Sequence, residues 1–152
     1  MMPLTIVKEL PILKDRAIET AIQKFIGEVD VKGNIDGFFN ATKEQILNST
    51  YRRQSGDFWL AWTEDGDVLG YVLASLSRDI DDRLTYCISQ AWANPIVRGT
   101  PWVKEAWARI RDQAKKYMCK HLMIVAGRNP KAYIRFLGKP WHEYATLLKE
   151  EL

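Results

Sequence analysis

The sequence predicts an α/β (α+β) fold with a mixed sheet, in which an antiparallel meander is followed by a β-α-β unit. Two observations predict it. A period-two pattern over residues 58–93, interrupted by Asp65-Gly66 and by a charged turn at 78–83, indicates three antiparallel strands. After it, an amphipathic helix of about 17 residues from Pro101 leads into the continuous apolar run 121–126, which is typical of a parallel strand.

The N-terminal third is expected to supply one strand and a first helix. Residues 4–7 are a short β-prone run that suits an edge strand. Pro11 offers a helix start, and apolar residues between 17 and 26 recur with a helical period. Gly27 is expected to end this helix.

A second helix is expected from about residue 43 to 51, because Thr42-Lys43-Glu44-Gln45 has the pattern of a capping box. Residues 28–41 before it are expected to be irregular. The aromatic pair Phe38-Phe39 within them either folds back onto the core or lines a substrate cleft, and packing on the core is favoured.

The remaining elements follow in order. The meander strands are expected at 58–63, 68–76 and 84–93. Thr100 suits the N-cap of the next helix, with Pro101 at its first position. A last helix over 130–137 and an extended segment over 141–148 complete the order β-α-α-β-β-β-α-β-α-β, which suits a single domain of residues 1–152.

Composition narrows the class of protein. A net charge of +3 without a long basic run predicts no nucleic-acid partner. The two cysteines, Cys87 and Cys119, lack metal-ligand spacing, so no metal site is expected, and Cys87 is expected to be buried. No signal peptide is recognised and no apolar run reaches the ~18 residues of a membrane span, so a cytoplasmic protein without membrane association is predicted. The six Trp and six Tyr residues either fill the core, which is favoured, or face a partner.

Two motifs frame the β-α-β unit. Ala93-Asn94-Pro95-Ile96-Val97-Arg98 fits a Val-x-Pro-x-x-Arg-type strand end, and Arg98-Gly99 begins an Arg/Gln-x-x-Gly-x-Gly/Ala loop. Asn129-Pro130-Lys131-Ala132 fits an Asn-x-x-Ala helix start. With this element order, the chain resembles the GNAT superfamily of acyl-CoA-dependent N-acyltransferases. The coarse match covers nearly the whole chain, and the motifs cover residues 93–138.

The resemblance implies an N-acetyltransferase that uses acetyl-CoA to acetylate a small-molecule amine or a protein amine. The helix start after the loop suits a pyrophosphate, because its free amides and its dipole attract anions. In the resembling enzymes a nearby acid, often Tyr, protonates the leaving thiolate, and Tyr133 is the catalytic candidate here. The cofactor-binding residues implied are Ala93, Pro95, Val97, Arg98, Gly99, Thr100, Trp102, Val103 and Asn129.

Three departures from the family pattern support an alternative. Pro101 and Val103 replace the small residues of the loop, and Pro101 brings no N–H. Phe136 stands where the family commonly has Tyr. The alternative is a non-catalytic, GNAT-like structural or interaction module of a larger assembly, with a protein partner or as a homo-oligomer.

A general base is also not obvious from the pattern. Residues 84–92 contain no carboxylate, and Asp81 and Asp82 fall in the turn before them, where they are expected to be solvated. His121 and His142 are the two side chains that titrate near neutral pH. A lone histidine is more often structural, so neither is assigned.

Overall fold

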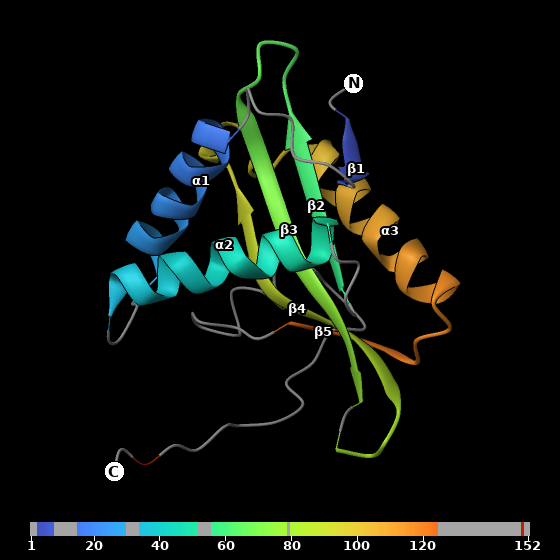
Figure 1. Ribbon diagram of the computed structural model, residues 1–152. Coiled ribbons are helices and arrows are strands. Elements are labelled where there is room, and N and C mark those ends of the chain that lie inside the picture. Colours follow the sequence, from blue (N-terminus) through green and yellow to red (C-terminus); the bar gives the residue numbers. More distant parts are fainter. Residues whose placement is uncertain are drawn as a thin grey trace.

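The computed structural model describes residues 3–7, 15–29, 34–51, 56–78, 80–124 and 150. Within these residues, five strands form one mixed sheet and three helices accompany it (Figure 1). The predicted α/β fold is confirmed. The elements are β1 (Leu4–Ile6), α1 (Asp15–Glu28), α2 (Ile35–Tyr51), β2 (Gly56–Trp62), β3 (Val68–Arg78), β4 (Leu84–Ala93), α3 (Pro101–Lys116) and β5 (His121–Ile124).

The sheet has the order β1-β2-β3-β4-β5. The first four strands are antiparallel neighbours, and β5 runs parallel to β4, as the meander and the β-α-β unit predict. Gly66 turns the β2–β3 hairpin at φ +91°, a left-handed conformation that glycine adopts without strain. The short N-terminal strand is confirmed at the β1 edge of this sheet.

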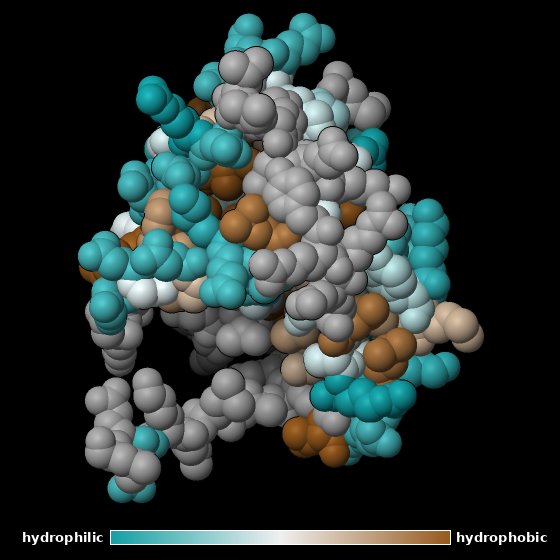
Figure 2. All heavy atoms as spheres, viewed as in Figure 1, coloured by the Kyte–Doolittle hydropathy of each residue, from teal (hydrophilic) through white to brown (hydrophobic). Residues whose placement is uncertain are grey.

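The helices cover opposite faces of the sheet (Figure 1). Trp59 and Ala61 of β2 pack with α3, whereas Phe58 and Leu60 pack with α1 and α2, because successive strand residues point to opposite faces. In the view of Figure 2, hydrophilic side chains predominate over α1 and α2, and hydrophobic ones show between them. Because the two sets of strand residues pack against different helices, the protein has two apolar clusters, one on each side of the sheet.

The second helix begins earlier than the capping-box pattern predicts. Asn34 precedes it, and the Asn34 side-chain Oδ1 accepts a hydrogen bond from the Gly37 amide at 3.1 Å, as an N-cap residue does. Thr42 and Gln45 therefore lie inside α2, and their pattern has another role. Gln90 Nε2 donates to Thr42 Oγ1 at 2.7 Å, and Gln45 Nε2 donates to Ser89 Oγ at 3.1 Å. Both side chains fasten α2 to β4.

The prediction that residues 28–41 are irregular is wrong from residue 35 onward, because α2 begins there. Phe38 and Phe39 lie on α2, where the Phe38 ring stacks on Phe25 at 6.3 Å and Phe39 packs against the cluster under α1 and α2. Packing on the core, the favoured expectation for this pair, is confirmed. Gly27 does not end the first helix, because α1 continues to Glu28.

The helix α3 confirms its predicted apolar stripe except at its end. Val103, Ala106, Ile110 and Ala114 are buried at helical spacing. The stripe does not extend to Met118, which is 79% exposed because the helix ends at Lys116 and Met118 turns outward with φ +62°.

The cysteines are less covered than expected. Cys87, predicted to be buried, is half-buried like Cys119, and both thiols are free. Burial raises the pKa of both thiols, so each is less reactive than an exposed cysteine.

A buried carboxylate joins β2, β4 and the residue that follows α3. Asp57, 6% exposed, accepts a hydrogen bond from the Tyr86 hydroxyl at 2.5 Å and another from the Tyr117 hydroxyl at 2.9 Å. Trp59 Nε1 donates to the Tyr86 oxygen at 2.9 Å. Burial, together with the bond to Asp57, raises the pKa of Tyr86, so this hydroxyl stays protonated and remains a donor.

Several expectations fall outside the described residues. These are the helix start at Pro11, the last helix over 130–137 and the extended segment over 141–148. The apolar run at 121–126 is described as far as Ile124, as β5.

Candidate functional site

The loop between β4 and α3 contains several of the predicted cofactor-binding residues. Asn94 turns the chain after β4, and its Oδ1 accepts from the Ile96 amide to open a short 3-10 helix, Pro95–Val97. Gly99 then takes φ +77°, where a side chain would be strained. Pro101 starts α3 as predicted, since a first-turn residue needs no N–H bond.

Thr100 occupies the N-cap position of α3, as predicted, but its side chain makes no capping bond. Its hydroxyl donates to the Val97 carbonyl at 2.6 Å instead. The helix N-terminus is therefore not closed by this side chain, and its positive end faces outward.

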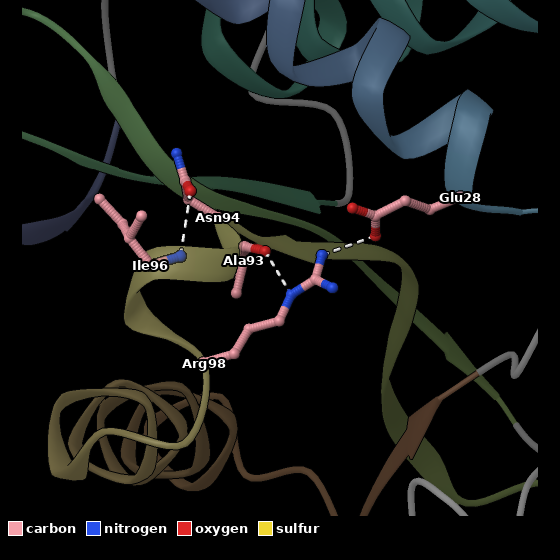
Figure 3. Close-up of polar contacts among 5 residues, drawn as sticks. All are labelled: Glu28, Ala93, Asn94, Ile96 and Arg98. Carbon is pink, nitrogen blue, oxygen red and sulfur yellow. Dashed lines mark hydrogen bonds and ion pairs between the residues drawn. The ribbon is translucent and has the colours of Figure 1, made fainter.

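Arg98 turns back from this loop toward the end of β4 (Figure 3). Its Nε donates to the Ala93 carbonyl oxygen at 2.8 Å. Its Nη2 forms an ion pair with Glu28 Oε2 at 2.6 Å, and the two side chains are 42% and 28% exposed. Glu28 is the last residue of α1, so this contact joins the helix on one face of the sheet to the loop that leads to the other.

A cavity of about 430 Å³ lies beside these groups. It is lined by the end of β4, the loop, the first turns of α3, the end of α1 and the facing part of β3. Trp92 and Trp102 are in its wall, and neither fills it. Among the described residues, the lining is apolar apart from Glu28, the Tyr71 hydroxyl, Arg98 and the indole N–H groups of the tryptophans. Its residues are Leu4, Phe25, Glu28, Val29, Gly70, Tyr71, Val72, Ala91, Trp92, Ala93, Arg98, Gly99, Trp102, Val103, Ala106, Trp107 and Ile110.

Pairing between β4 and β5 is described along one part of β4. The strand β5 pairs with β4 from Thr85 to Ile88, and β4 continues to Ala93. Along 89–93, none of the described residues pairs with β4 on that side. The cavity lies beside residues 91–93, at the end of β4.

Only some of the predicted cofactor-binding residues that the structure describes line the cavity. Five of them line the cavity: Ala93, Arg98, Gly99, Trp102 and Val103. Val97, Pro95 and Thr100 do not. Val97 is 3% exposed and belongs to the core under α3, and Pro95 faces solvent. Asn129 and the catalytic candidate Tyr133 lie outside the described residues.

The donors that a phosphate could use are few but well placed. The Gly99 amide donates to no group within the described part of the chain, and a Cβ built there would meet nothing within 4 Å. The Thr100 amide donates to the Val97 carbonyl at 3.2 Å, and Pro101 has no N–H. A phosphate therefore fits this loop through Arg98, the Gly99 amide and the dipole of α3.

Sequence reasoning missed two titratable residues of the cavity, Glu28 and Tyr71. The Tyr71 hydroxyl donates to Gln90 Oε1 at 3.1 Å, and burial raises the Tyr71 pKa, so it stays protonated. The position of Glu28 at the end of a helix is the one feature that could have indicated it. A carboxylate at the C-terminal end of a helix is disfavoured by the helix dipole, which indicates a compensating cation elsewhere.

Among the side chains considered as bases, the described ones do not line the cavity, and His142 lies outside the described residues. Asp81 and Asp82 are exposed, as predicted, and lie at the opposite end of β4 from Ala93. His121 begins β5 and pairs in register with Thr85, also at that far end.

The conformation of Gly99 leads to a prediction. Gly99→Ala is expected to destabilise the protein by about 1–2 kcal/mol, because alanine is strained at positive φ although space is open around it. Gly27→Ala is the matched control. Gly27 lies in α1 with the same free space, so alanine is expected to stabilise by about 0.5–1 kcal/mol. Urea denaturation measures both, and equal effects of the two substitutions would contradict the assigned loop conformation.

The protein is similar in structure to solved acetyltransferases. No family model matches the sequence, and no curated protein matches it. The aminoglycoside N-acetyltransferase AAC(6')-Iy, in complex with a bisubstrate analog, matches with a TM-score of 0.70 at 14% identity, over 100% of this chain and 99% of that chain. A putative acetyl transferase from Pyrococcus furiosus matches with 0.66 at 17% identity, over 99% and 100%. Glucosamine-6-phosphate N-acetyltransferase from Arabidopsis thaliana matches with 0.64 at 14% identity, over 99% and 98%.

At sequence identities of 14–17%, these structural matches establish the fold alone. The chain has the fold of the GNAT acetyltransferases, so the resemblance inferred from the sequence is confirmed at that level. Among the described helices, none is long and apolar enough to cross a membrane. The cytoplasmic location and the absence of a nucleic-acid partner stay predictions from composition.

Proposed function

We propose that the protein is an acetyl-CoA-dependent N-acetyltransferase that acetylates a small-molecule or protein amine. One observation carries the proposal. The cavity lies where the end of β4, the Arg98 side chain and the N-terminus of α3 meet. The solved structures of this fold include an acetyltransferase with CoA and the same enzyme with a bisubstrate analog.

Each part of the cavity has a task in this reaction. Acetyl-CoA supplies an acetyl group that its thioester activates toward amines. Arg98, the Gly99 amide and the α3 dipole would hold its phosphates. The apolar walls exclude water and lower the pKa of a bound amine, which favours the neutral form that can attack. Tyr133 remains the proposed donor of a proton to the leaving thiolate.

The direct test is titration of the protein with acetyl-CoA by calorimetry, followed by a transfer assay. In the assay, release of the CoA thiol is followed with a panel of primary amines and amine-bearing peptides. Saturable binding and amine-dependent thiol release are expected. No binding at millimolar acetyl-CoA would overturn the proposal.

A non-catalytic interaction module is the second candidate. It is favoured by Pro101, which brings no N–H donor to the loop. This candidate requires a protein that binds a protein partner or itself and does not bind acetyl-CoA. Co-purification and sedimentation, together with the titration above, measure this. Amine-dependent turnover would remove it.

A further inference from the structure

We propose that Glu28 is an internal competitor for Arg98, so that a phosphate ligand enters the site by displacing the Glu28 carboxylate. This inference rests on the proposed function, because it concerns how that site admits its anionic ligand. The Glu28–Arg98 ion pair, hereafter the latch, joins the end of α1 to the loop (Figure 3).

The position of Glu28 explains why the latch forms. Glu28 ends α1, and the last turn of that helix carries no basic residue. The partial negative charge of a helix C-terminus repels a carboxylate there. Arg98 belongs to the β4–α3 loop, 70 residues away in sequence, and supplies a positive charge at 2.6 Å.

Two hydrogen bonds already occupy the Arg98 guanidinium. Its Nε donates to the Ala93 carbonyl, which fixes the guanidinium at the end of β4, and its Nη2 donates to Glu28. A guanidinium binds a phosphate best through two parallel N–H groups. Glu28 occupies one of the groups that such a bond would use, and both residues line the same cavity. Phosphate and carboxylate therefore compete for one cation.

The competition has a modest and measurable size. Half-exposed ion pairs of this kind contribute little, so their loss changes affinity by about two- to fivefold. Glu28→Gln removes the competing charge and keeps the shape of the side chain. Binding of every anion that uses Arg98 is expected to tighten by that same factor, because the displaced contact is the same for each.

The experiment compares Glu28→Gln with Glu19→Gln by calorimetric titration with inorganic pyrophosphate and with CoA. Glu19 lies on the same helix and pairs with Lys43 at 2.8 Å, with side chains 42% and 43% exposed. The control therefore removes the same charge and a partly exposed ion pair, away from the cavity. Glu28→Gln is expected to tighten both ligands about two- to fivefold relative to Glu19→Gln. Circular dichroism confirms that each variant is folded.

A double variant separates the latch from a general gain of positive charge. In the Arg98→Gln background, Glu28→Gln is expected to have no further effect, since the shared cation is absent. Equal affinities for Glu28→Gln and Glu19→Gln would overturn the latch while leaving the proposed function standing. Tighter pyrophosphate binding without CoA binding would support the latch and overturn the proposed function. No binding of either ligand by any variant would overturn both.

Discussion

Replacing Arg98 with glutamine is expected to weaken acetyl-CoA binding about 10- to 100-fold. Hydrogen bonds to charged groups contribute about 1.5–3 kcal/mol each, and Arg98 is the only cationic side chain among the described residues that line the cavity. The Gly99 amide and the α3 dipole would remain, so weak binding should persist. Calorimetric titration measures the change, and its sensitivity to salt should fall with the lost charge.

The matched control is Arg111→Gln. Arg111 is exposed on α3 and does not line the cavity, so its loss changes the net charge equally and should leave the affinity within about twofold of wild type. Equal weakening by the two substitutions would show that net charge, and not the position of Arg98, determines binding. The assignment of the loop would then be wrong.

Removing the buried carboxylate of Asp57 is expected to destabilise the protein by about 2–4 kcal/mol. Asp57→Ala deletes the acceptor of two tyrosine hydroxyls, and Tyr86 is fully buried, so its proton is left without a partner. Asp57→Asn keeps an oxygen in place and should cost less. Urea denaturation followed by circular dichroism measures the free energy of unfolding.

Tyr117→Phe provides the scale for this result. It deletes one of the two hydrogen bonds at a half-buried position and should cost about 1 kcal/mol. Asp57 does not line the cavity, so acetyl-CoA affinity should not change in any of the three variants. A destabilisation below about 0.5 kcal/mol for Asp57→Ala would mean that the cost of burying the charge cancels its hydrogen bonds.

Local patterns in the sequence predicted most of the fold. The Asp65-Gly66 turn, the alternation along 84–93 and the Thr100-Pro101 helix start each depend on neighbouring residues, and the structure has all three elements. The pattern misled at Thr42 and Gln45. Their capping-box spacing is real, but both side chains bond to β4, and the helix begins at Asn34 instead.

The candidate site was predicted only along one segment. The sequence indicated the loop and five residues that line the cavity, because a phosphate loop is contiguous in the chain. It did not indicate Glu28 or Tyr71. These residues reach the cavity from α1 and β3, and no spacing rule relates them to Arg98.

What the sequence determined by itself was the order and the types of the described elements and the loop before α3, since turns, caps and hydrophobic periods act over a few residues. Tertiary structure alone decided the partners. It brought Glu28 to Arg98, Asp57 to Tyr86 and Tyr117, and Thr42 to Gln90. A hydrogen bond or an ion pair depends on distance in space, and residues far apart in the chain approach only when the sheet and its two helical layers are assembled. For the β4–α3 loop, the effect was to give Arg98 a competing carboxylate.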